Sequence, residues 1–88
     1  MSEREYFEFQ GTTYDVTFGV SEIVRHGGPF DRGSADSWYS RGIRPHYFSG
    51  ASYFSDEVTE DMMTAEEIKQ YLAGYEYNEQ FGDKKDWG

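Results

Sequence analysis

Hydrophobic and polar residues alternate in two stretches near the start of the chain, a pattern typical of β-strands. Tyr6–Phe9 and Tyr14–Phe18 are rich in the aromatic and β-branched residues that strands favour. Residues 10–13 between them include Gly11, which suits a short hairpin turn. We therefore predict an N-terminal β-hairpin. Because an isolated hairpin is marginally stable at best, its apolar face must pack on another element.

The apolar spacing changes to a helical period near the end of the chain. Thr64 followed by Glu67 forms a capping-box pattern. An apolar stripe follows at positions i, i+3, i+4 and i+7, namely Ile68, Tyr71, Leu72 and Tyr75. These features predict a helix over about residues 65–80 that stops near Gly82. Gly74 in its middle costs about 1 kcal/mol relative to alanine, so we expect another segment to approach its backbone closely.

A shorter helix is predicted over about residues 32–41, with Asp31 as N-cap and Gly42 as C-cap. Its apolar positions follow helical spacing at Ala35, Trp38 and Tyr39. This helix also carries small residues at 33–35. We predict that the two helices cross where these small residues meet residues 73–74, with the hairpin covering the aromatic side.

The predicted fold is α+β: an N-terminal β-hairpin packed on two helices, in one domain over residues 1–88. Residues 21–25 predict a single helical turn, and residues 43–58 predict a long ordered loop anchored by aromatic side chains, including Tyr53 and Phe54. Only 36% of the residues are hydrophobic, whereas 19% are aromatic. Since each buried ring removes a large apolar area from water, we expect a small core built mainly from rings.

The formal net charge of −9 narrows the classes of partner. Acidic residues concentrate in residues 1–24 and 50–79, and residues 25–49 are weakly basic. Direct binding to nucleic acid depends on clustered Lys and Arg, so we expect no direct nucleic-acid contact and favour a cationic partner. The chain has no cysteine. It has no apolar run of membrane-spanning length and no signal-peptide pattern at its start, so we expect a cytoplasmic location and no membrane contact.

The residues favour neither catalysis nor a metal site. His26 and His46 lack ligand spacing, although Asp31 and Asp36 are potential co-ligands. A triad of Ser34, His46 and Asp36 lacks the motif of a nucleophile elbow. We therefore expect no enzymatic activity, no metal and no cofactor. A further hypothesis is a small-anion site formed by Arg32, Asp36, Arg41 and His46.

Two groups of residues are candidate partner-binding sites. The first is acidic and would present carboxylates as a nucleic-acid mimic does, although helix capping and solubility also explain these acids: Asp56, Glu57, Glu60, Asp61, Glu66 and Glu67. The second group is aromatic and falls opposite the Ile68 stripe on a helical wheel: Tyr77, Phe81 and Trp87. These three would form an exposed apolar patch, unless the C-terminal tail folds back and buries them.

Two stretches of the chain, 29–48 and 64–87, resemble a family of small proteins of tailed bacteriophages whose function is not established. The shared blocks are Asp31-Arg32-Gly33-Ser34-Ala35-Asp36, Pro45-His46-Tyr47, Gly74-Tyr75 and Lys85-Asp86-Trp87. The hairpin lies outside this resemblance.

The resemblance implies a phage accessory protein that acts on the host. Together with the charge, it favours a non-enzymatic protein that binds and modulates a host protein, as an acidic inhibitor or nucleic-acid mimic of a nucleic-acid-handling protein. The alternative is a small structural or virion-associated module that self-associates through the hairpin edge.

Overall fold

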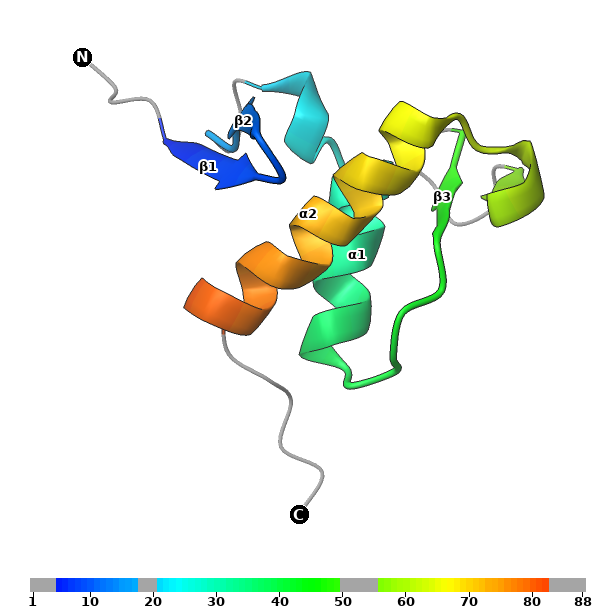
Figure 1. The fold of residues 1–88 in the computed structure, drawn as a ribbon. Coiled ribbons are helices and arrows are strands. Elements are labelled where there is room, and N and C mark those ends of the chain that lie inside the picture. Colours follow the sequence, from blue (N-terminus) through cyan, green and yellow to red (C-terminus); the bar gives the residue numbers. More distant parts are fainter. Residues whose placement is uncertain (1–4, 18–20, 50–55, 83–88) are drawn as a thin grey trace.

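The computed structural model describes residues 5–17, 21–49 and 56–82. In chain order the elements are β1 (Tyr6–Phe9), β2 (Thr12–Asp15), the 3-10 helix η1 (Glu22–Val24), α1 (Pro29–Trp38), β3 (His46–Phe48), β4 (Glu57–Thr59), the 3-10 helix η2 (Glu60–Met62) and α2 (Ala65–Phe81). The layout is α+β, as predicted: an antiparallel hairpin followed by two helices, with a second small sheet. Figure 1 shows α2 lying across α1, with the hairpin and β3 on opposite sides of the pair.

The hairpin forms with a tighter turn than predicted. β1 and β2 pair antiparallel, with Phe7 opposite Tyr14. Gln10 and Gly11 have φ values of 49° and 79°, and positive φ at both central residues is what a two-residue type I′ turn requires. The second strand therefore starts at Thr12 and ends at Asp15. The predicted strand over residues 14–18 was wrong at both ends.

The core lies where the hairpin meets the two helices. Its buried members come from β1, β2 and the segment after it, η1, α1 and α2: Phe7, Tyr14, Val16, Val24, Phe30 and Ala73. Partly buried Tyr77 packs against them, with its ring centroid 5.4 Å from that of Phe7. As expected from the composition, rings supply much of this core. Four aromatic residues lie outside the described residues: Phe18, Tyr53, Phe54 and Trp87.

Helix α1 starts at Pro29 rather than at residue 32. Gly28 is its N-cap and Pro29 its first helical residue, a position that suits proline because no helical N–H bond is lost there. Asp31 is not the N-cap; its carboxylate accepts a hydrogen bond of 3.0 Å from the Gly27 N–H. The turn predicted over residues 21–25 is the 3-10 helix η1. Gly27-Gly28-Pro29 therefore both ends that turn and starts α1.

The end of α1 also differs from the prediction. The helix ends at Trp38, and Ser40 beyond it adopts a left-handed conformation with φ of 57°. The Arg41 N–H then donates to the Asp36 carbonyl oxygen at 2.9 Å, as in a Schellman closure. The predicted C-cap, Gly42, therefore lies beyond the helix.

The predicted apolar stripe of α1 is not its buried face, because α2 packs on the face that carries Gly33. Trp38 and Tyr39 are 38% and 36% exposed, and Ala35 is half-buried. The buried residues of α1 are Pro29, Phe30, Arg32, Gly33, Asp36 and Ser37.

The two helices cross at Gly33 and Gly74, which confirms the predicted contact between small residues. A Cβ atom added to Gly33 would lie 2.0 Å from the Tyr71 carbonyl oxygen, and one added to Gly74 would lie 2.0 Å from the Phe30 carbonyl oxygen. These separations are far shorter than any van der Waals contact. Glycine is therefore required at both positions for the two backbones to approach this closely.

Polar groups complete the interface between α1 and α2. The buried Tyr71 hydroxyl donates to the Asp36 carboxylate and accepts from the Arg44 N–H at 2.9 Å. Farther along the helices, the Asn78 side-chain amide donates to the Ser37 hydroxyl at 3.0 Å. Each buried polar side chain named here has a partner, as stability demands.

Helix α2 is covered on two sides, by α1 and by the hairpin. It begins after Thr64 with the predicted capping box and ends with Gly82 as C-cap. Its buried residues are Tyr71, Ala73, Gly74 and Asn78. Of the predicted stripe, Tyr71 is buried, but Ile68, Leu72 and Tyr75 are only half-buried, because the face against α1 is centred on Tyr71, Gly74 and Asn78.

Part of the loop predicted over residues 43–58 is a second sheet. β3 and β4 pair antiparallel, with Tyr47 opposite Val58. The Phe48 N–H also donates to the Gly27 carbonyl oxygen at 2.8 Å, which joins β3 to the segment before α1. Three-residue strands are too short for an alternation of apolar and polar residues to reveal them.

Replacing Gly33 or Gly74 with alanine is expected to lower the free energy of unfolding by about 2 kcal/mol or more, because overpacking of this kind costs roughly 1–3 kcal/mol. This change in the free energy of unfolding is opposite in sign to the effect of helix propensity, which alone favours alanine by about 1 kcal/mol. Equilibrium urea unfolding measures the change. The matched control is Ala35→Gly in α1, which should cost only about 1 kcal/mol. Wild-type or higher stability of Gly74→Ala would show that the helices do not cross here.

Candidate functional site

Six carboxylates gather where β4, η2 and the first turn of α2 follow one another along the chain. They are the six acids predicted as a partner-binding group, and we call this region the acidic end: Asp56, Glu57, Glu60, Asp61, Glu66 and Glu67. All are exposed except Glu67, which is half-buried. Because β4, η2 and α2 follow one another with few residues between them, all six acids fall within residues 56–67.

Most of the negative charge of the acidic end is not neutralised by the described part of the chain. Arg44 pairs with Glu57, with 3.2 Å between the guanidinium nitrogen and the carboxylate oxygen. Among residues 5–17, 21–49 and 56–82, no basic side chain forms an ion pair with Glu60, Asp61, Glu66 or Glu67. Met62, next to Asp61, is 69% exposed. An apolar side chain therefore lies within an anionic surface.

Three hydrogen bonds connect the first turns of α2 to the hairpin. The Tyr14 hydroxyl donates to Glu66 Oε1 at 3.3 Å. Lys69 Nζ donates to the Gln10 carbonyl oxygen at 3.2 Å and to the Thr12 hydroxyl. Burial, followed by the Glu66 charge, raises the pKa of Tyr14 to about 12. Tyr14 therefore remains a hydrogen-bond donor to Glu66 throughout the physiological pH range.

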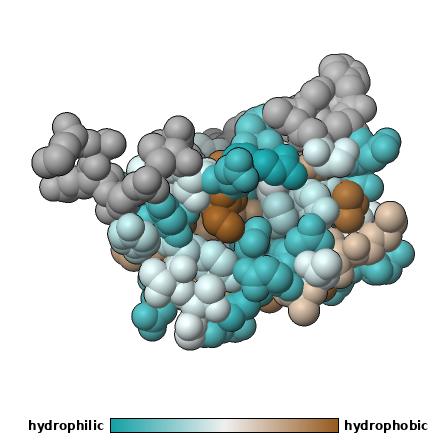
Figure 2. Space-filling view, turned by 90° about the horizontal axis from the view of Figure 1, so that it is seen from above, coloured by the Kyte–Doolittle hydropathy of each residue, from teal (hydrophilic) through white to brown (hydrophobic). Residues whose placement is uncertain are grey.

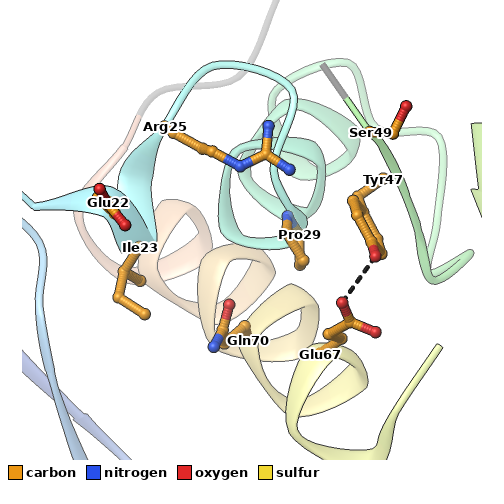
Figure 3. A pocket seen from close by; sticks show the side chains of 8 residues that line it. All are labelled: Glu22, Ile23, Arg25, Pro29, Tyr47, Ser49, Glu67 and Gln70. Atoms are coloured by element: carbon orange, nitrogen blue, oxygen red, sulfur yellow. Dashed lines mark hydrogen bonds between the residues drawn. The ribbon is translucent and has the colours of Figure 1, made fainter. Parts of the chain in front are cut away.

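A cleft of about 440 Å³ opens beside the acidic end (Figure 3). Its walls come from η1, the start of α1, β3 and α2: Glu22, Ile23, Arg25, Pro29, Tyr47, Ser49, Glu67 and Gln70. Glu67 belongs to both the cleft and the acidic end. Figure 2 views the molecule from above relative to Figure 1, and there hydrophilic residues surround small, separate hydrophobic areas. This face favours polar and ionic contacts over a broad apolar one.

Glu67 has a fixed position in the cleft. Its Oε2 accepts from the Tyr47 hydroxyl at 2.7 Å, and its Oε1 accepts from the Thr64 N–H at 2.9 Å. These bonds, led by that from Thr64, hold the pKa of Glu67 below its usual value. The hydrogen bond between Tyr47 and Glu67 in turn raises the pKa of Tyr47. The pair is therefore a carboxylate and a neutral phenol.

The two described aromatic candidates, Tyr77 and Phe81, contact each other, with 5.3 Å between their ring centroids, but differ in exposure. Tyr77 is half-buried in the edge of the core, because the hairpin covers this side of α2. Phe81 is 66% exposed and packs edge-on against Phe7 at 6.0 Å between ring centroids. Trp87 lies outside the described residues. A groove of about 350 Å³ at this place is lined by Glu5, Tyr6, Val16, Tyr77 and Phe81.

Three members of the predicted anion group come together around Asp36, which is buried. Arg41 Nε lies 3.4 Å from Asp36 Oδ1, and His46 Nδ1 lies 3.8 Å from Asp36 Oδ2. Arg32 instead pairs with Asp31 at 3.2 Å. Arg41 and His46 thus face a carboxylate of their own chain, in the polar network that joins α1, α2 and β3.

Sequence reasoning missed several residues of the site. Glu22, Arg25 and Tyr47 line the cleft, but no pattern in the sequence brings them together, because the cleft is assembled from four separate elements. Met62 did carry a signal: it is an apolar residue directly after two acids, outside both predicted helices.

Comparisons with models of protein families, with curated proteins and with solved structures found no match to this chain. Within the described ranges, no group of three His, Cys, Asp or Glu side chains is placed to hold a metal ion. In the same ranges, no helix is both long and apolar enough to cross a membrane.

Replacing Tyr47 with phenylalanine is expected to raise the pKa of Glu67, because one of the hydrogen bonds to its carboxylate is lost. ¹³C NMR titration of the Glu67 side chain measures this, with Tyr75→Phe as the control that leaves Glu67 unchanged. Because the folded-state pKa lies below the unfolded value of about 4.5, Glu67 stabilises the fold above that pH and loses this effect as the pH falls. Tyr47→Phe should therefore reduce the loss of stability in acid. An unchanged Glu67 pKa would show that the bond does not form in solution.

Proposed function

We propose that this chain is a non-enzymatic accessory protein that binds a basic surface of a partner protein through its acidic end. The observation that carries the proposal is the state of Glu60, Asp61 and Glu66, which are exposed and have no ion pair within the described residues. Exposed, unneutralised carboxylates attract and orient a cationic partner. Met62 supplies an adaptable apolar contact among them.

The partner class that fits best is a nucleic-acid-handling protein. Such proteins carry clustered lysine and arginine side chains that bind phosphates, and a carboxylate surface can occupy the same place. The resemblance of residues 29–48 and 64–87 to small phage proteins supports a host protein as the target, in the cytoplasm of the host cell. Binding would modulate the target by excluding its nucleic acid. The proposal needs no cofactor, no membrane and no direct nucleic-acid contact.

The alternative, a structural or virion-associated module that self-associates, is favoured by the groove at Phe81. Tyr6 and Phe81 are 63% and 66% exposed there, and β1 pairs only with β2 among the described strands, so one edge of the hairpin is open to another copy. Glu5 and Glu8 on this edge oppose self-association by charge repulsion. Sedimentation velocity separates the two functions, because a stable mass above 10.3 kDa that persists at high salt would favour self-association.

Removing two charges from the acidic end is expected to weaken partner capture. The variant Glu60→Gln with Asp61→Asn should lose affinity about two- to fivefold for each charge removed, since exposed ion pairs are worth up to about 1 kcal/mol each. Capture by immobilised protein from bacterial lysate, at low and moderate salt, measures this loss. Binding by the wild-type protein should weaken with salt because exposed charges are screened, and duplex DNA should compete for the captured protein.

The matched control is Glu5→Gln with Glu8→Gln, which removes the same charge from the hairpin and should leave capture intact. Equal losses in the two double variants would show that only net charge matters. Capture that is insensitive to salt and to DNA would contradict an electrostatic interface.

A further inference from the structure

The cleft beside the acidic end combines the groups that recognise a long cationic side chain. Ile23 and Pro29 provide apolar walls, and the Tyr47 ring provides an aromatic one. Figure 3 shows Glu22 and Glu67 on opposite sides of the cleft, with Gln70 between them. A lysine or arginine side chain has the matching construction, an apolar stem that carries a charged head.

The chain's own cation at this cleft is already engaged. Arg25 donates to the Phe48 carbonyl oxygen at 3.1 Å, and its guanidinium carbon lies 6.0 Å from the centroid of the Tyr47 ring. It forms no ion pair with either cleft carboxylate among the described residues. The cleft therefore has two carboxylates and one guanidinium group, which leaves an excess of negative charge.

Both carboxylates retain acceptor capacity for an incoming donor. Glu22 is exposed, and within the described ranges only its backbone carbonyl accepts a hydrogen bond, from the Arg25 N–H. Glu67 accepts one hydrogen bond at each oxygen, whereas a carboxylate has about four lone-pair positions. The carboxylates of Glu22 and Glu67 would repel a bound anion. A bound apolar group would remove these carboxylates from water without a compensating interaction.

We propose that this cleft receives one lysine or arginine side chain from the partner's basic surface. The alkyl stem lies along Ile23 and Pro29, and the charged head lies between Glu22 and Glu67. The volume of about 440 Å³ is within the range of pockets that hold small ligands. This inference rests on the proposed function and adds to it a single anchoring contact.

The position of the cleft explains how such a contact would act. Glu67 is shared with the acidic end, so a cation in the cleft sits at the border of the larger anionic surface. The acidic end then attracts the partner over a distance, and the cleft fixes its register with one buried side chain. Interfaces commonly concentrate their binding energy in a few such enclosed contacts.

The test uses N-acetyl-lysine amide and N-acetyl-arginine amide as probes, with N-acetyl-norleucine amide as the uncharged control with an alkyl stem. ¹H–¹⁵N NMR titration of the full chain should show shifts at Ile23, Arg25, Ser49 and Gln70 with one or both cationic probes. The dissociation constant should be on the order of 1 mM, as expected for ligands of this size. The comparison of the two cations shows which head group the cleft prefers.

Glu22→Gln should weaken probe binding about two- to fivefold, and Glu8→Gln on the hairpin should not change it. Equal shifts with the norleucine probe, no effect of Glu22→Gln, or shifts confined to Glu60 and Asp61 would each overturn the proposal. The acidic-end double variant should still bind the probes in the cleft. If capture depends on the acidic end but the probes fail, the proposed function stands and this inference falls.

Discussion

The close approach of α1 and α2 at Gly33 and Gly74 fixes the helix pair against which the hairpin and β3 pack. Each glycine lies against a backbone carbonyl of the opposite helix, where a Cβ atom would lie 2.0 Å from the carbonyl oxygen. This short separation brings the Tyr71 hydroxyl to the Asp36 carboxylate, in a buried hydrogen bond between the helices. In a chain with few aliphatic residues, tight backbone packing and satisfied polar groups take the place of a large aliphatic core.

Helix α2 transmits this constraint to the surface. It packs on α1 along one side and on the hairpin along another, and its first turn carries Glu66 and Glu67. The cleft exists because η1 and β3 are held on either side of that turn, with Tyr47 bonded to Glu67. Glu66 and Glu67 are thus presented on a fixed framework rather than on a solvated run of charge. A preorganised surface loses less conformational freedom when it binds.

The parts of the fold that sequence could predict are those with a local physical cause. A glycine in mid-helix costs free energy unless another backbone needs the space, so Gly74 indicated the crossing, and Thr64 with Glu67 marked the start of α2. The start of α1 was misplaced because a Gly-Gly-Pro sequence serves both to end a turn and to begin a helix. The acidic end was visible as a run of acids. The cleft was not, since Glu22 and Tyr47 meet only through the tertiary fold.

Native-state hydrogen exchange tests the central claim, that the helix crossing is the most stable part of the molecule and supports its binding surface. Amides around Gly33 and around Gly74 should exchange slowest, at the rate set by global unfolding, and those of η2 should exchange faster through local opening. Exchange at the crossing that is as fast as in η2 would contradict the account, because the surface would then have no rigid framework beneath it.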